Sequence, residues 1–347
     1  DRTRNLLAPN RESAMTTAAP AASGSPGPEA SGPAPSAPAA GRIAAKQRPG
    51  DLWFSGTAVF AGSMIVVTLA AVAIFLIVQS LPAFGATSET ASLLSSNFWE
   101  YVAPLLFGTI WAAFLALLVA VPLSLGIALF ITHYAPRRLA QTLGYVVDLL
   151  AAVPSVVYGL WGILVFAPSV VPTYKWLNEN LGWIPLFSGQ VLNSGRTILT
   201  AALVLAVMVV PIITAICREI FLQTPRLHEE AALALGATRW EMIRMAVLPF
   251  GRSGIVSASM LGLGRALGET MAVAMVLSAT NVVTLNLLTS QNPSTIAANI
   301  ALTFPEAYGL NINVLIATGL ILFVVTFAVN AVARWIVSRR KEFSGAN

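Results

Sequence analysis

The side chains with the clearest chemical potential in this sequence are three ionisable residues inside long apolar stretches: Asp148, Arg265 and Glu269. In hydrocarbon each would cost at least about 2.5–3.5 kcal/mol, so each needs a partner or a water-filled lining. Arg265 and Glu269 are four residues apart, which places them on one face of a helix where they can pair. A guanidinium group is permanently charged, and its planar fork matches a tetrahedral oxyanion. We therefore expect Arg265 to meet an oxyanion, and Glu269 to hold the arginine when no anion is present.

The alternative for this pair is a permanent ion pair that only fixes helix packing. Thr270, next to Glu269, and Ser155, next to Pro154, are the remaining candidate pathway residues. Asp148 lies nearer one end of its apolar stretch. We expect it to pair with Arg137 or Arg138, and a place on the pathway is the alternative.

The composition excludes several other kinds of chemistry. Of the 347 residues, 56% are hydrophobic and only 10% are charged, whereas a soluble domain carries roughly 25% charged residues. The single cysteine, Cys217, and two histidines are too few for a disulfide or a metal cluster. None of the three lysines follows a glycine, so no phosphate-binding P-loop is present. The sequence thus predicts a membrane protein that is not an enzyme and has no cofactor of its own.

Six apolar segments are long enough to cross a bilayer as helices, which requires about 20 residues. These segments are residues 57–78, 102–131, 143–166, 197–217, 255–279 and 313–337. Pro154 lies within the third, where it either breaks the helix or only kinks it. The predicted fold class is therefore an all-α, polytopic protein with six transmembrane helices.

The basic residues predict the orientation of these helices. They cluster before the first span, between the second and third, between the fourth and fifth, and after the sixth, whereas the other side carries only Lys175 and Arg196. By the positive-inside rule both termini lie in the cytoplasm. The excess of 20 Lys and Arg over 15 Asp and Glu is then topological, and no nucleic acid is expected as a partner. Residues 51–340 form the membrane domain, and the Ala- and Pro-rich residues 1–50 are expected to be a disordered cytoplasmic tail.

The cytoplasmic loop at residues 224–252, TPRLHEEAALALGATRWEMIRMAVLPFGR, has apolar residues at helical spacing. Gly236 lies at its middle, where a positive φ would end one short helix before the next. Pro249 and Gly251 are expected to end the second helix. The loop is thus predicted to form two amphipathic surface helices, and an ordinary surface loop is the alternative.

This loop resembles the EAA loop of the ABC-importer permeases, which have a MetI-like fold. The resemblance rests on a set of residues at matching spacing: Glu230, Ala231, Ala232, Gly236, Leu248 and Pro249. The segments AAVPSVVYGL (151–160) and GRALGETMAV (264–273) resemble the phosphate-specific permeases of the PstC type, and the last three residues favour this type over its PstA sister.

The resemblance implies a permease subunit for inorganic phosphate in a bacterial plasma membrane, with both termini cytoplasmic. It also implies a second, PstA-like permease, a PstB-like ATPase dimer that holds ATP and Mg, and an extracytoplasmic PstS-like phosphate-binding protein. The six loop residues would dock on the ATPase. Arg265 and Glu269 would form the intramembrane pair of the pathway. Membrane lipid would surround the protein.

Three alternatives stay open at this point. The permease could serve another oxyanion, such as sulfate or molybdate. A proton-coupled secondary transporter would use Glu269 or Asp148 as a titrating group, but it predicts an inverted repeat that the sequence does not show. An intramembrane enzyme would need a catalytic constellation that the sequence lacks.

Overall fold

The computed structural model describes residues 49–341, with side chains described from residue 53 to 335. The tail predicted to be disordered lies outside these described residues, apart from Pro49 and Gly50. The described residues fall into two compact units, one ending at Phe60 and one beginning at Ala61, and each is described by itself. The first unit contains the opening turns of helix α1 (Pro49–Ser80).

Six helical runs in the described part of the chain are long and apolar enough to cross a membrane, which confirms the predicted all-α class and the number of spans. Their bounds are Trp53–Gly85, Phe98–Tyr134, Ser155–Leu181, Ile198–Leu222, Arg239–Gly268 and Leu310–Trp335. No residue in the most apolar window of the first run is buried. This run continues from α1 into the 3₁₀ turn η1 (Leu81–Gly85), which packs on helix α12 (Leu310–Lys341).

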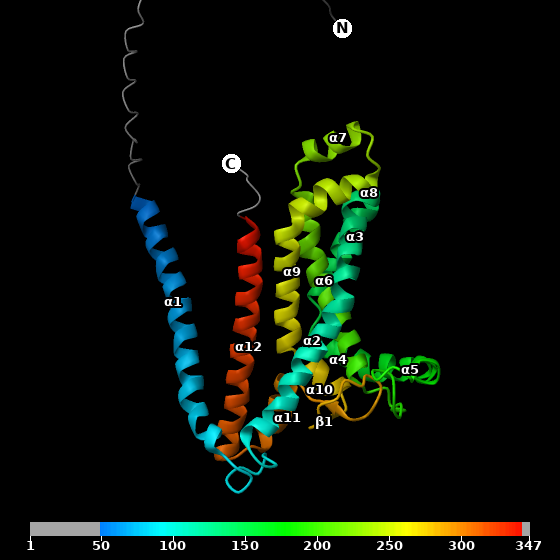
Figure 1. Cartoon of the computed structure of the whole chain (residues 1–347). Coiled ribbons are helices and arrows are strands. Elements are labelled where there is room, and N and C mark those ends of the chain that lie inside the picture. The colour runs from blue at the N-terminus through cyan, green and yellow to red at the C-terminus, as the bar shows by residue number, and fades with distance from the viewer. Residues whose placement is uncertain (1–48, 342–347) are drawn as a thin grey trace, which may run out of the picture. The chain divides into compact units, whose positions relative to one another are not determined.

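The centre of the second unit consists of α2 (Phe98–Leu129), α6 (Ile198–Leu222) and α9 (Leu248–Gly268), which pack side by side (Figure 1). Helix α2 begins at Asn97, whose side-chain oxygen accepts the Glu100 N–H at 3.0 Å. A buried stripe of small residues, Ala112, Ala116 and Ala120, belongs to the same core cluster as the α6 side chains. Small residues at four-residue spacing let two helix backbones approach closely.

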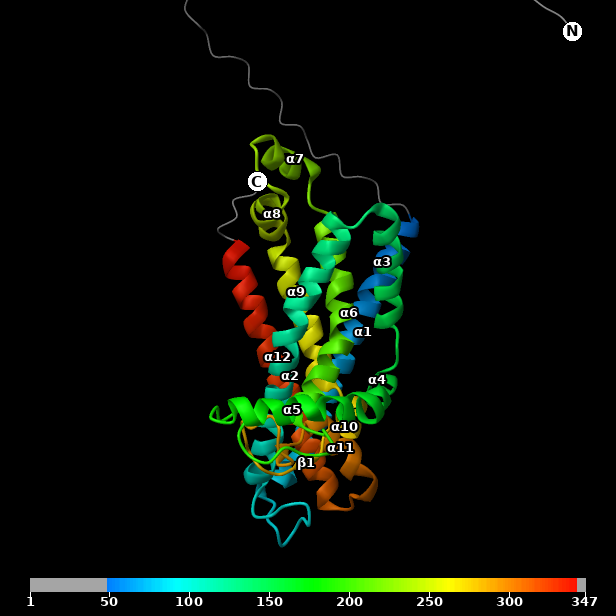
Figure 2. The same cartoon turned by 90° about the vertical axis from the view of Figure 1, so that its right-hand side faces the viewer.

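The third predicted span, residues 143–166, is two helices rather than one. Helix α3 (Arg137–Ala151) ends before Pro154, and α4 (Ser155–Trp161) begins directly after it. Proline has no N–H and disfavours helical geometry in the residue before it, so the helix breaks here instead of only bending. After the π-helical turn η3 (Gly162–Phe166), helix α5 (Ala167–Leu181) lies across the direction of the long helices (Figure 2). The segment that runs along α6 is therefore α3, with α4 as its continuation.

The fifth predicted span, residues 255–279, is also interrupted. Helix α9 ends at Gly268, Glu269 has an extended backbone (φ −70°, ψ 126°), and the short helix α10 (Met271–Val276) follows. Beyond it lie the remaining described elements. These are β1 (Ala279–Thr280), β2 (Asn292–Pro293), α11 (Ile296–Thr303) and the 3₁₀ turn η5 (Phe304–Glu306), and the two strands pair in parallel with Ala279 opposite Asn292.

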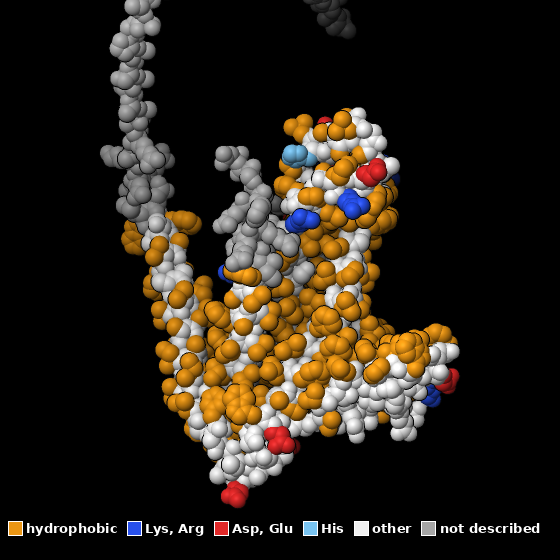
Figure 3. Space-filling view, in the orientation of Figure 1, with side chains coloured by type: hydrophobic (Ala, Val, Ile, Leu, Met, Phe, Trp, Pro, Cys, Tyr) orange, Lys and Arg blue, Asp and Glu red, His pale blue; other side chains and the backbone are white. Residues whose placement is uncertain are grey.

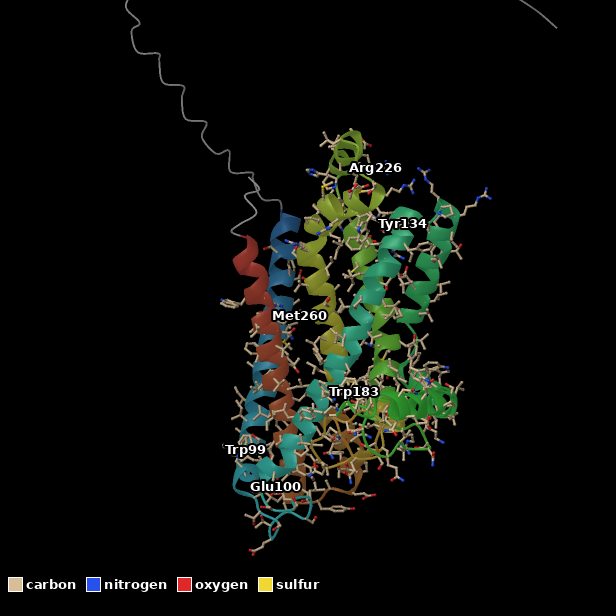
Figure 4. All side chains as sticks on the ribbon, turned by 45° about the vertical axis from the view of Figure 1, so that its right-hand side comes forward. Trp99, Glu100, Tyr134, Trp183, Arg226 and Met260 are labelled. Carbon is tan, nitrogen blue, oxygen red and sulfur yellow. The ribbon has the colours of Figure 1, made fainter. Side chains whose placement is uncertain are left out.

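Hydrophobic side chains cover the long helices of the second unit, whereas charged groups gather at its two ends (Figure 3). Helices α7 (Arg226–Ala234) and α8 (Arg239–Met242) lie at one end, which we call the α7 end, and α11 lies at the opposite, α11 end. Figure 4 shows Tyr134 and Arg226 at the α7 end and Trp99 and Glu100 at the α11 end. This distribution is the one expected of a chain whose middle contacts lipid.

Candidate functional site

The interruption between α9 and α10 determines where Glu269 points. Its side chain is buried, with 8% exposed, and its carboxylate accepts the Ala272 N–H at 3.1 Å. The Thr270 hydroxyl turns back to the Gly268 carbonyl at 3.2 Å. A carboxylate at this position satisfies a backbone donor that the first turn of α10 cannot satisfy itself. Glu269 thus stabilises the start of α10.

The predicted pairing of Arg265 with Glu269 is therefore wrong. The prediction assumed one continuous helix, and the four-residue spacing loses its meaning when the helix ends at Gly268. No ion pair joins the two residues in the described part of the chain, and Arg265 is exposed. It lines a cavity of about 900 Å³ among α6, α9 and α12, so its charge faces open space.

Tyr158 bridges the break between α3 and α4 by a hydrogen bond. Within a helix the Leu150 carbonyl would accept from residue 154, but Pro154 has no N–H to donate. The buried Tyr158 hydroxyl donates to this carbonyl at 2.9 Å instead. The sequence contained a signal for this contact, since Leu150 and Tyr158 lie four residues before and after the proline. We did not single out Tyr158 from the sequence.

Tyr158 also lies on α4, the helix that connects this break to the one after α9. Helix α4, whose first residue is the half-buried Ser155, packs directly on α10. A β-carbon on Gly159 would come within 3.0 Å of the Ala272 Cα, so glycine allows this close approach. The two breaks are thus neighbours, and the fold gathers Ser155, Glu269 and Thr270 around the α4–α10 contact.

Arg196 is a second residue that the sequence did not single out for the site. It lies just before α6 and donates to the carbonyls of Met275 and Leu277 at 3.2 and 3.4 Å. A cation at the end of a helix offsets the partial negative charge of the last carbonyls. Helix α10 is therefore held by Glu269 at its start and by Arg196 at its end.

Replacing Tyr158 with phenylalanine tests whether its hydrogen bond to the Leu150 carbonyl stabilises the break between α3 and α4. The Leu150 carbonyl would lose this short bond and keep the longer one from the Val153 N–H at 3.3 Å, so we expect destabilisation of about 0.5–1.5 kcal/mol. The measurement is thermal and denaturant unfolding of the detergent-purified protein. Tyr145→Phe on α3 is the matched control, since that side chain is 72% exposed and should tolerate the change. Equal stability of the two variants would contradict the assigned role of Tyr158.

Asp148 pairs with a residue that the sequence did not indicate. Its carboxylate lies 3.3 Å from the Arg218 guanidinium on α6, so the predicted pairing with Arg137 or Arg138 is wrong. Those two arginines lie at the opposite end of α3, ten or more residues away, which is about 15 Å along a helix. The Arg218 side chain crosses α3 at Gly144, where a β-carbon would come within 2.6 Å of it. The pair thus joins α3 to α6.

The segment around α7 and α8 has the predicted two-helix form. Gly236 has a φ of 85° between the two helices, as expected, and no side chain of α7 is buried. Glu230 and Ala231 are exposed, whereas Ala232 packs against the core. Four large apolar side chains of α7, α8 and the turn between them are exposed: Leu227, Leu233, Leu235 and Trp240. His133 at the end of α2 ties α7 to the bundle through Glu229, with 3.6 Å between Nε2 and Oε1.

Pro249 does not end the second of these helices, contrary to the prediction. Helix α8 passes through the π-helical turn η4 (Ile243–Val247) into α9, and Pro249 lies in the first turn of α9. A proline is tolerated in a first turn, and the wider π turn before it already alters the hydrogen-bond pattern. The half-buried Leu248 packs against the core beside it. One helical run therefore extends from Arg239 to Gly268 and carries Arg265 near its end.

Comparisons with known proteins found one matching family model and several similar permeases. Residues 120–342 match the family model described as binding-protein-dependent transport system inner membrane component. The phosphate transport system permease protein PstC 2 of Mycobacterium tuberculosis is 48% identical over 308 residues, which are 85% of this chain and 94% of that protein. The phosphate transport system permease protein PstC of Mesorhizobium japonicum is 40% identical over 308 residues, or 85% and 92%.

Solved structures support the fold alone. A chain of the bacterial alginate ABC transporter in complex with an alginate pentasaccharide-bound periplasmic protein aligns with a TM-score of 0.57. The alignment covers 84% of this chain and 95% of that one at 17% sequence identity. A second crystal structure of a bacterial ABC transporter for alginate import aligns with a TM-score of 0.54, again at 17% identity.

Proposed function

The chain belongs to the family of binding-protein-dependent transport system inner membrane components, and we propose that it is the permease subunit of an ATP-driven phosphate importer. With a second permease it would form the transmembrane pathway for inorganic phosphate. The observation that supports this most directly is Arg265, an exposed guanidinium group without an ion pair among the described residues, in a cavity between apolar helices. The bacterial relatives, which are phosphate transport system permeases, support the choice of substrate.

This permease would work with several partners. We propose a PstA-like second permease, two copies of a PstB-like ATPase, and a PstS-like phosphate-binding protein outside the membrane. The ATP and Mg belong to the ATPase, and this chain contributes no catalytic group. It is a multi-pass inner membrane protein, and we place the α7 end and both termini in the cytoplasm because the basic residues gather on that side.

The continuous run from α8 to α9 supplies a route for the ATPase to act on the pathway. Arg239 and Arg265 lie 26 residues apart on one helical run, about 39 Å along its axis. When the ATPase dimer closes, it would move α7 and α8, and the attached α9 would carry Arg265 with it. The permease halves would then rock between two arrangements, as packed interfaces do in other transporters.

In this mechanism we give Arg265 and Glu269 different roles. Because Glu269 is engaged with the Ala272 N–H, Arg265 keeps its donors available for an anion. Phosphate would be bound by charge-assisted hydrogen bonds from the guanidinium, and Glu269 would act by holding α10 in place. Ser155 and Thr270, at the starts of the two broken helices, are the further pathway residues that we propose.

Uptake by the complete transporter tests this function. The two permeases, the ATPase and the binding protein would be reconstituted in liposomes with ATP inside, and labelled phosphate uptake measured. We expect uptake that requires ATP, resists a protonophore and is not reduced by excess sulfate or molybdate. Uptake of either of those anions in place of phosphate would refute the substrate, and ATP-independent uptake that a protonophore stops would refute the ATP-driven mechanism.

A further inference from the structure

The cavity that contains Arg265 extends well beyond it along α9. The α9 residues that line it come in three pairs, each four residues from the next: Val256 and Ser257, Met260 and Leu261, and Gly264 and Arg265. They form one face of the helix and span about 13 Å along its axis. Figure 4 labels Met260, midway along this face. Arg265 lies at the end nearer the helix break, and Ser257 lies toward the α7 end.

Helix α12 lines the cavity with a second arginine. Asn330 and Arg334 are four residues apart and so lie on one face of α12, and both border the cavity. They lie in the part of α12 that approaches the α7 end (Figure 1). Among the described residues, the lining contains two permanently charged cations, Arg265 and Arg334, and no acidic side chain.

Neither arginine is neutralised by another side chain in the described part of the chain. Among the described residues, no ion pair involves Arg265 or Arg334, and no hydrogen bond occupies the Asn330 amide. Two cations that share a cavity between apolar helices disfavour each other, and an anion would relieve this repulsion. Guanidinium and amide N–H groups together provide several donors, which suits an oxyanion with several acceptor oxygens.

We propose that Arg334 and Asn330 form a second binding station for inorganic phosphate, between Arg265 and the α7 end. This inference rests on the proposed function and adds a step to it, in which phosphate leaves Arg265 for Arg334 before it leaves the membrane. Two weak sites in series allow an anion to enter favourably and still depart. A phospholipid headgroup has the same phosphate chemistry, but it would reach only the end of the cavity with Arg334, whereas the lining continues to Arg265.

Phosphate binding to the whole transporter in nanodiscs tests the station. Labelled inorganic phosphate would be titrated without ATP in nanodiscs made only of zwitterionic lipid, and again with anionic lipid added. We expect Arg334→Gln to weaken binding at one site by about tenfold to a hundredfold, as loss of a charge-assisted bond should. Arg334→Lys should restore part of the affinity, because it keeps the charge without the planar fork. Arg138→Gln removes one exposed positive charge outside the cavity and should change nothing.

Other outcomes would overturn the station and identify what replaces it. Suppose that Arg334→Gln leaves phosphate binding unchanged in zwitterionic nanodiscs but abolishes the change in binding that anionic lipid causes in the wild type. The site then holds a lipid headgroup. If Arg334→Gln changes neither phosphate binding nor the effect of anionic lipid on that binding, Arg334 is not an anion site in the assembled transporter. In both cases ATP-driven phosphate uptake by the wild type would still support the proposed function. If the wild type does not import phosphate, the proposed function itself is refuted, whatever Arg334 binds. Co-purification of the ATPase with each variant checks assembly.

Discussion

Transporters that carry Arg265→Gln are expected to lose phosphate uptake almost completely. Glutamine keeps hydrogen-bond donors and much of the length of the side chain but removes the permanent charge and the bidentate fork. Loss of charge-assisted bonds worth about 3 kcal/mol would lower the apparent affinity for phosphate by about a hundredfold. Since Arg265 is exposed and has no ion pair among the described residues, the change should not destabilise the helices.

The measurement is labelled phosphate uptake at low external phosphate, with ATPase assembly and ATP binding checked in parallel. Arg138→Gln again provides the control, because it removes one exposed basic charge outside the lining of the cavity. Uptake within about twofold of wild type in Arg265→Gln would remove Arg265 from the pathway, and would leave the α7–α8 segment as the main functional feature of this chain.

The second large effect is expected at Leu235, at the end of α7. This side chain is 90% exposed, although burial of a leucine is worth about 1.5–3 kcal/mol. Its exposure at the tip of the α7–α8 segment is explained if the ATPase covers it. Leu235→Asp would put a carboxylate into that interface, and we expect the ATPase to dissociate about a hundredfold more readily, with uptake lost as a consequence.

Pull-down of the ATPase by the detergent-solubilised permease pair would measure this effect. Thermal unfolding of the isolated chain should not change, since Leu235 makes no buried contact within it. Leu227→Asp changes a second exposed leucine, 78% exposed at the start of α7, and shows whether the whole helix or only its tip is covered. Retention of the ATPase by Leu235→Asp would refute docking at the tip of the segment.

Much of this architecture could be predicted from local patterns in the sequence. Long apolar runs predicted six spans, and Gly236 predicted the turn between two surface helices, which its φ of 85° confirms. Such predictions succeed because the physical cause is local. A bilayer requires about 20 apolar residues in a helix, and glycine tolerates a positive φ wherever it lies.

The pairing of charges could not be predicted in the same way. Arg265 and Glu269 have the spacing of a helical pair, but Glu269 is held by the Ala272 N–H once the helix has ended at Gly268. Asp148 has two arginines on its own helix, yet Arg218 reaches it from α6 across Gly144. In each case the partner depends on which backbone group or helix lies nearest in space, and spacing along the chain does not contain that information.

The sequence by itself determined that this chain has six segments long and apolar enough to cross a membrane, an arginine in the fifth of them, and a Glu-Ala-Ala segment in the loop between the fourth and the fifth. Only the tertiary structure decided that α4 and α10 pack at neighbouring breaks, that α8 runs on into α9, and that Arg334 shares a cavity with Arg265. The physical reason is that membrane insertion depends on the composition of each segment, whereas these contacts depend on how segments far apart in the chain pack against one another.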